Sequence, residues 1–150
     1  MIFRGTFEYA LDAKHRLTVP AKYRAAFAAG AVLAYSPATE ADGARSLSLW
    51  QPESYDTYAQ QALAAINPLS PRAREVRRAL FNNSWELELD SANRLMIPGT
   101  ALAFAGLDKE VVITGSGDCL EIWDRKAHAE YNAGVLARFP EIAASFDHTD

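Results

Sequence analysis

The sequence predicts an α+β fold with a mainly β core, formed by two copies of one small unit. The stretch L-D-A-K-H-R-L-T-V-P at residues 11–20 recurs as L-D-S-A-N-R-L-M-I-P at residues 89–98. Segments in which apolar and polar residues alternate, as in half-buried strands, accompany both stretches. Runs of helix-forming residues follow them. This internal repeat predicts a two-unit architecture, independently of any single helix or strand.

The repeat extends beyond the two stretches in both directions. Upstream, F-E-Y-A-L at residues 7–11 corresponds to W-E-L-E-L at residues 85–89. Downstream, L-S-L-W at residues 47–50 corresponds to L-E-I-W at residues 120–123. One copy alone is marginal for an independent core, so we expect the two copies to exchange strands and bury one shared face.

The first copy is predicted to alternate strands and helices. Alternation indicates strands at residues 7–11 and 17–19, paired like a hairpin with a corner at residues 12–16. Pro20 ends the second strand and opens a helix over residues 21–29, which Gly30 ends. Strands at residues 31–35 and 47–50 flank a loop at residues 36–45, and a helix covers residues 52–66.

A basic helix joins the copies, and the second copy repeats the order of the first. Ser70 followed by Pro71 predicts the start of that helix, which extends over residues 72–81. The second copy has predicted strands at residues 85–89, 95–97, 110–114 and 120–123, a corner at residues 90–94, and helices at residues 99–105 and 125–136. The polar and acidic residues after Arg138 are expected to fray. This divides the chain into residues 1–66, 67–84, 85–136 and 137–150: first copy, connecting helix, second copy and acidic tail.

Composition indicates a folded protein of the reducing cytoplasm. With 150 residues, 49% of them hydrophobic, the chain fits one domain or two halves sharing a core. The apolar runs are too short to cross a bilayer, and the N-terminus lacks the pattern of a signal peptide. Cys119 is the single cysteine, which excludes an internal disulfide.

Charge is distributed unevenly between the halves and between the two corners. The net charge is −4, but residues 1–81 hold 10 Lys/Arg against 7 Asp/Glu, whereas residues 82–150 hold 5 against 12. Four cations and one anion lie within residues 12–24, against one of each within the matching residues 90–102. If these cations only maintained the fold, both copies should carry similar numbers of them. The asymmetry therefore favours a phosphate-binding edge at the first corner over a solvated basic loop.

Each corner holds an Asp and an Arg four residues apart. Asp side chains hydrogen-bond their own backbone in turns, and Arg can pair with the carboxylate, so Asp12 and Asp90 are predicted to be structural. Arg16 is the best candidate for a base contact, because Arg can bind two acceptors on a guanine edge. For Arg94, the sequence favours a structural role and a DNA-binding role equally. The cations predicted to hold phosphates are Lys14, Lys22 and Arg24.

Several motifs together resemble the MraZ family over nearly the whole chain. They are D-A-K-H-R-L-T-V-P followed by A-K-Y-R, the second block ending in L-M-I-P, and A-G-L-D-K-E-V-V-I-T-G followed by E-I-W-D. The family's D-x-x-x-R pairs fall on Asp12 with Arg16 and on Asp90 with Arg94. Where the family usually has Gly before the motif Arg, this chain has His15 and Asn93. Gly there serves a backbone with positive φ, which Asn tolerates and His adopts less comfortably.

The resemblance implies both a fold and a function. The fold is a tandem of swapped-hairpin AbrB-like (SpoVT-AbrB type) units that forms a double-psi-like β-barrel with peripheral helices. The function is that of a bacterial transcriptional regulator of the division and cell-wall gene cluster. Such a protein binds short direct repeats in double-stranded promoter DNA, its own promoter included. It assembles as a homo-oligomeric closed ring, and is cytoplasmic and nucleoid-associated.

Two other functions compete with DNA binding. One is a structural or interaction ring that acts through a protein partner. The connecting helix could bind that partner through Arg72, Arg74, Arg77 and Arg78. An Arg-rich helix face of this kind is more often solvated or paired with an acidic region. The other is an enzyme. The histidines are scattered, without Cys or carboxylate at metal-ligand spacing, and no Gly-rich phosphate loop follows a strand. We therefore expect no catalysis, cofactor, metal or small-molecule substrate, and no membrane contact.

Overall fold

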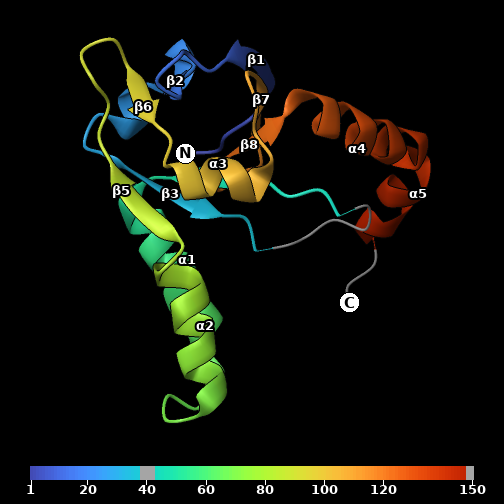
Figure 1. Ribbon diagram of the computed structural model, residues 1–150. Coiled ribbons are helices and arrows are strands. Elements are labelled where there is room, and N and C mark those ends of the chain that lie inside the picture. Colours follow the sequence, from blue (N-terminus) through green and yellow to red (C-terminus); the bar gives the residue numbers. More distant parts are fainter. Residues whose placement is uncertain (38–42, 148–150) are drawn as a thin grey trace.

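The computed structural model describes residues 1–37 and 43–147, and in this part of the chain strands form a six-stranded antiparallel sheet and a separate two-stranded ribbon (Figure 1). The strands are β1 (Thr6–Ala10), β2 (Arg16–Thr18), β3 (Ala31–Tyr35), β4 (Leu47–Trp50), β5 (Ser84–Leu87), β6 (Arg94–Met96), β7 (Glu110–Gly115) and β8 (Leu120–Asp124). The α-helices are α1 (Pro52–Ala64), α2 (Pro71–Phe81), α3 (Gly99–Ala105), α4 (Arg125–Ala137) and α5 (Phe139–Ala144). Short 3-10 helices are η1 (Ala21–Tyr23), η2 (Ala25–Phe27) and η3 (Ser145–Asp147). The α+β class with a mainly β core is confirmed.

The two copies exchange strands within the large sheet. Its order is β1-β7-β8-β4-β3-β5, so β1 of the first copy pairs with β7 of the second, and β5 of the second pairs with β3 of the first. Strands β4 and β8, one from each copy, pair at the centre. The predicted exchange is therefore confirmed, and each copy completes the sheet of the other.

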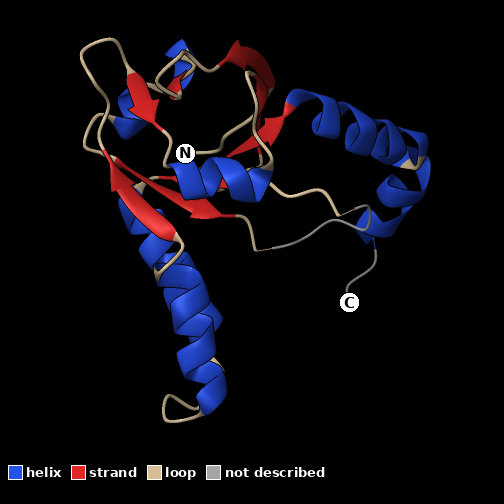
Figure 2. Cartoon of the chain, viewed as in Figure 1, coloured by secondary structure: helices blue, strands red, loops and turns tan. Residues whose placement is uncertain are grey.

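The predicted hairpin between residues 7–11 and 17–19 is wrong in its pairing. Strand β2 pairs instead with β6 of the second copy, with Leu17 opposite Leu95, and this ribbon is a second sheet that does not pair with the large one (Figure 2). Each corner turns the chain out of the large sheet, so β2 and β6 are left to satisfy each other's backbone groups. The hydrogen bonds join the strands into an open sheet and a ribbon, not into one closed barrel.

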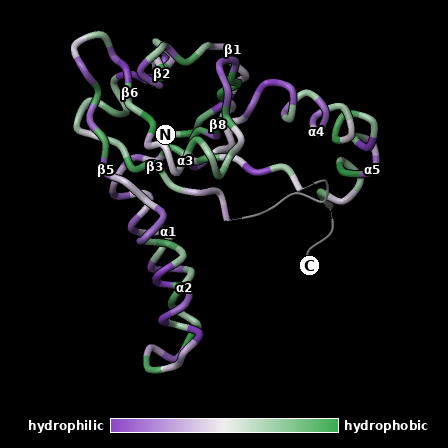
Figure 3. The backbone as a smooth tube through the Cα atoms, in the orientation of Figure 1, coloured by the Kyte–Doolittle hydropathy of each residue, from purple (hydrophilic) through white to green (hydrophobic). Residues whose placement is uncertain are grey.

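The main core lies where the ribbon meets one face of the large sheet. Leu17 and Leu95 point from the ribbon into this core and are fully buried, together with Leu33, Leu49 and Ile122 of the sheet. Helix α3 adds Ala101, Leu102 and Ala105. In Figure 3 the tube is largely hydrophobic around α3, whereas hydrophilic and hydrophobic stretches alternate along α1 and α2. The burial holds the ribbon in a fixed position over the sheet.

The predicted helix at residues 21–29 forms two short 3-10 helices instead. Tyr23 is anchored by its hydroxyl, which donates to the Arg4 carbonyl and accepts from the Arg4 N–H at 2.8 Å each. Phe27 stacks on Phe3 with ring centroids 5.6 Å apart. These tertiary anchors override the helix propensity of the alanines between them.

Helices α1 and α2 form an arm that projects away from the sheet, at the opposite end of the view from the ribbon (Figure 1). The predicted cap of α2 is confirmed, since Ser70 Oγ accepts from the Ala73 N–H at 3.1 Å. The Tyr55 hydroxyl ties the helices together by donating to the Leu80 carbonyl at 2.6 Å.

The C-terminal part differs from the prediction. Residues after Arg138 were expected to fray, but α5 and η3 continue the chain beyond α4. Pro140 in the first turn and Glu141 after it are residues that favour a helix start. The predicted loop at residues 36–45 can be compared only in part, because residues 38–42 lie outside the described part of the chain.

Candidate nucleic-acid interface

The β2–β6 ribbon presents a polar outer face above a fully apolar inner one. Arg16 lies opposite Met96, and Thr18 lies opposite Arg94. These four residues point outward, because the alternate pair, Leu17 and Leu95, is fully buried. Repeat-related Arg residues thus flank a pseudo-twofold axis on one exposed surface.

Backbone hydrogen bonds from the corners extend the ribbon at both ends. The carbonyl of His15 accepts from the Ile97 N–H at 2.9 Å, and the carbonyl of Asn93 accepts from the Val19 N–H at 3.0 Å. Each corner is therefore fixed to the strand of the opposite copy.

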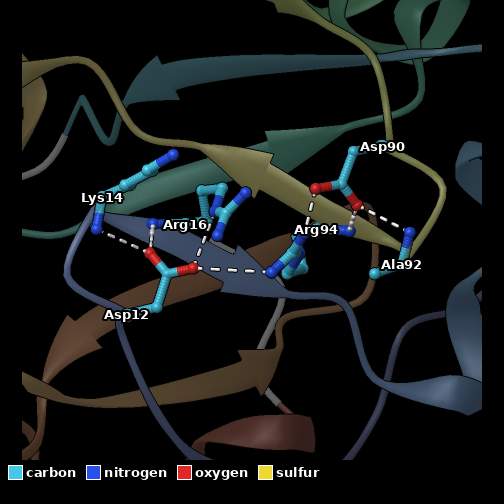
Figure 4. A network of polar contacts seen from close by, with 6 residues as sticks. All are labelled: Asp12, Lys14, Arg16, Asp90, Ala92 and Arg94. Atoms are coloured by element: carbon cyan, nitrogen blue, oxygen red, sulfur yellow. Dashed lines mark hydrogen bonds and ion pairs between the residues drawn. The ribbon is translucent and has the colours of Figure 1, made fainter.

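Asp12 organises the first corner (Figure 4). Its Oδ1 accepts from the backbone N–H groups of Lys14 and Arg16 at 2.9 Å each, and its Oδ2 accepts from Arg16 Nε at 2.7 Å. The backbone N–H of Arg16, above all, holds the pKa of Asp12 down at about 2, and the Arg16 side chain and the Lys14 N–H add to this. The carboxylate therefore stays ionised at neutral pH.

Asp90 builds the second corner in the same way. Its Oδ1 accepts from the backbone N–H groups of Ala92 and Arg94, and its Oδ2 accepts from Arg94 Nε, all at 2.9 Å. The backbone N–H of Arg94 is the main cause that lowers the pKa of Asp90. The structural role predicted for both aspartates thus has a concrete geometry.

Both corners contain one residue with positive φ. His15 has a φ of 57° and Asn93 a φ of 61°, which puts both in the left-handed region. These are the positions at which the resemblance led us to expect such a backbone. The left-handed residue reverses the chain between the Asp and the Arg, so the two side chains meet.

The two corners also contact each other. Arg94 Nη1 lies 3.7 Å from Asp12 Oδ2, so the carboxylate of the first copy faces the arginines of both (Figure 4). The side chains of Asp12, Arg16 and Arg94 are each between a quarter and a third exposed. They form a continuous charged cluster at the ribbon surface.

The other predicted cations all belong to the first copy. Lys14 at the corner and Lys22 in η1 are exposed, and the Lys22 ammonium lies 5.6 Å from the centroid of the Tyr23 ring. Arg24 is half-buried, and its Nε donates to the Val19 carbonyl at 3.0 Å. Arg24 therefore also secures the end of the ribbon.

Sequence reasoning missed Lys109, which the fold brings to the first corner. The Leu11 N–H donates to the Lys109 carbonyl at 2.8 Å, as a continuation of the β1–β7 pairing. Lys109 and Asp108 line an open hollow of about 390 Å³ together with Asp12 and His15. No local pattern points to Lys109, because only the strand exchange brings residues 12 and 109 together.

Cys119 and His128 lie outside the β2–β6 ribbon and its corners, just before β8 and in α4. Burial raises the pKa of the Cys119 thiol to about 11, which leaves it protonated. Burial also lowers the pKa of His128, whose ring packs against Trp123. Within residues 1–37 and 43–147, no group of three or more His, Cys, Asp or Glu residues could hold a metal ion. No helix in the same ranges has the length and apolar character to cross a bilayer.

Comparison with known proteins identifies the family. The family model described as "MraZ protein, putative antitoxin-like" matches the chain twice, at residues 2–79 and 80–147. The chain belongs to the MraZ family. The double match agrees with the internal repeat, and each matched segment includes one of the two Asp–Arg corners.

Members of the MraZ family from several bacteria resemble the chain over almost its entire length. A protein of Mycoplasmoides gallisepticum named transcriptional regulator MraZ is 36% identical over 146 residues, which cover 97% of this chain and 98% of that relative. A Nocardioides protein of the same name is 36% identical over 99% of both chains. One from Corynebacterium urealyticum is 38% identical over 92% of both.

Proposed function

We propose that this MraZ-family chain is a transcriptional regulator that binds double-stranded DNA through its β2–β6 ribbon. The observation that carries the proposal is the pair of Asp-anchored arginines, Arg16 and Arg94, on the outer face of that ribbon. A two-stranded β-ribbon fits the major groove, where the edges of the bases can be distinguished. The relatives' name, transcriptional regulator, supports the same function.

Arg16 is held in a state suited to reading a base. Asp12 binds its Nε, and among the described residues no hydrogen bond from its terminal Nη1 or Nη2 is found. The two terminal amino groups of an arginine can donate together to O6 and N7 of guanine. Because the anchored side chain has already lost much of its freedom, less entropy is lost on binding. Asp12 thus acts as a positioning residue.

The surrounding cations suit phosphate contacts. Lys14 and Lys22 are exposed on the first copy's side, where the second copy has Ala92 and Thr100. Arg24 caps the short helix that holds Lys22, and Lys109 adds charge beside Asp12 and His15. So few cations release few counterions, and one protomer alone should bind DNA weakly. Assembly of several protomers into a closed ring would raise the affinity through linked sites.

Family membership supports a proposal for the biological setting. We propose that the DNA carries short direct repeats upstream of the division and cell-wall gene cluster, the chain's own promoter included. The protein would then act in the cytoplasm at the nucleoid. A regulator of this kind needs no catalytic group, cofactor or metal.

A titration tests this function. Labelled DNA from upstream of the chain's own gene and a scrambled duplex of equal length are titrated with the protein at several salt concentrations, with mass measured by light scattering. We expect tighter binding to the upstream DNA, a loss of affinity with rising salt, and a mass of several protomers. Equal binding to both duplexes, or none, would contradict the proposal.

The arm offers a second candidate, an oligomer that acts through a protein partner. Arg72 and Arg78 are exposed on α2, whereas Arg74 and Arg77 donate to carbonyls of the loop between α1 and α2. These charges lie on the arm, away from the ribbon, and could meet an acidic protein surface. Charge reversal at Arg72 and Arg78 that altered the measured mass, but left the DNA affinity of the smallest binding unit unchanged, would favour a role in assembly.

A further inference from the structure

Met96 is an apolar side chain on the polar face of the ribbon. The residue is 58% exposed, although its neighbours Leu95 and Ile97 are buried. The alternation of the strand therefore directs Met96 outward, to the same face as Arg16 and Arg94. The fold itself gains little from a methionine at this position.

Met96 lies directly opposite Arg16. In an antiparallel pair, Cβ atoms of opposed residues lie about 4.5–5.5 Å apart, and the two side chains share one face. Successive bases of one DNA strand are about 3.4 Å apart. A ribbon that brings Arg16 to one base edge therefore brings Met96 within reach of an adjacent base.

The chemistry of the major groove indicates which group Met96 would meet. The base edges carry hydrogen-bond donors and acceptors, and their apolar group is the C5-methyl of thymine. Methionine is flexible and adapts its thioether to irregular surfaces, which suits contact with a single methyl group. An exposed apolar side chain beside a guanine-reading Arg thus fits a thymine next to that guanine.

We infer that Met96 is a specificity-determining residue that contacts the C5-methyl group of a thymine adjacent to the base bound by Arg16. The inference rests on the proposed function, since it requires the ribbon to enter the major groove. It assigns a base-reading role to the second copy, at a position that lies outside both Asp–Arg corners.

Deoxyuridine substitution tests the contact, because uracil lacks the C5-methyl group and keeps the hydrogen-bonding groups of thymine. Footprinting first locates the protected segment of the upstream DNA. Each thymine in it is then replaced singly by deoxyuridine. Binding is measured for the wild type, for Met96→Ala, and for Leu136→Ala, a control whose side chain is 61% exposed on α4, away from the ribbon.

At one position, deoxyuridine should weaken wild-type and Leu136→Ala binding about fourfold, the effect of one lost methyl contact. Met96→Ala should bind the thymine duplex about as weakly as wild type binds the deoxyuridine duplex, and should not distinguish the two. An unchanged mass and unfolding midpoint for Met96→Ala would confirm that only the contact was removed.

Three results would overturn the inference. If the wild type binds every deoxyuridine duplex as tightly as the thymine duplex, it makes no methyl contact. The proposed DNA binding would not be affected by that result. Equal discrimination by wild type and Met96→Ala would assign the contact to another residue. A failure of wild type to bind any upstream duplex would remove the proposed function and this inference together.

Discussion

Arg94 Nη1 of the second copy lies 3.7 Å from Asp12 Oδ2 of the first, whereas Asp90 binds the arginine of its own corner. The two corners are therefore related by repeat but not equivalent in charge. Asp12 faces two guanidinium groups, Arg16 and Arg94. Loss of its charge should disturb both arginines of the ribbon surface.

This asymmetry predicts unequal effects of two matched substitutions. Asp12→Asn removes the negative charge shared by Arg16 and Arg94, while Asp90→Asn affects Arg94 alone. Asp12→Asn should lower the urea midpoint of unfolding more, and should weaken DNA binding more. Unfolding curves and DNA titrations of both variants check this. Equal losses would show that the contact across the copies has no energetic weight.

The low pKa of Asp12 predicts a pH dependence with a defined sign. The ordinary pKa of 3.8 falls to about 2 in the folded chain. Because the folded value is the lower one, the carboxylate stabilises the fold fully above pH 4, and this contribution is lost as the pH falls toward 2. The stability difference between wild type and Asp12→Asn should therefore shrink over that range. Urea unfolding at a series of pH values measures it, and a constant difference would contradict the prediction.

The positive φ of His15 predicts opposite outcomes for two substitutions. Glycine adopts a φ of 57° without strain, so His15→Gly should be at least as stable as wild type. A β-branched side chain is strained there, and His15→Val should lose about 1–2 kcal/mol. The exposed imidazole makes packing a minor factor. Denaturant unfolding compares the three proteins; equal stability of the Gly and Val variants would mean that the corner has another conformation.

The two repeat-related tryptophans differ in hydrogen bonding. Trp50 Nε1 donates to Ser48 Oγ at 2.9 Å, whereas Trp123 Nε1 is buried with no hydrogen-bond partner among the described residues. Both rings pack against the tyrosine of the following helix, Tyr58 and Tyr131 respectively. Trp50→Phe should therefore destabilise the protein by about 1 kcal/mol more than Trp123→Phe. Denaturant unfolding of both variants measures the two free energies of unfolding, and a lower value for Trp123→Phe would contradict the prediction.

Local chemistry made much of this protein predictable from sequence. The period-two alternation indicated the strands, and Ser70 with Pro71 indicated the start of α2. The Asp–Arg spacing indicated the corners, because an Asp carboxylate binds N–H groups two and four residues later. Both kinds of signal depend on residues close in sequence.

Long-range pairing was less predictable. The partner of β2 proved to be β6, about 80 residues away, and no local pattern distinguishes it from β1. Lys109 escaped notice for the same reason, since only the pairing of β1 with β7 brings it to Asp12. The 3-10 helices around Tyr23 and Phe27 depend on aromatic contacts with Phe3, which residue propensities do not contain.

The affinity of Arg16→Ala for the upstream DNA, measured beside that of Arg72→Ala, tests DNA binding through the ribbon most directly. Both substitutions remove one arginine, but Arg16 lies on the ribbon and Arg72 on the arm. We predict that Arg16→Ala binds roughly 5- to 150-fold more weakly than wild type, while Arg72→Ala binds about as tightly as wild type. Undiminished binding by a folded Arg16→Ala protein would contradict the account.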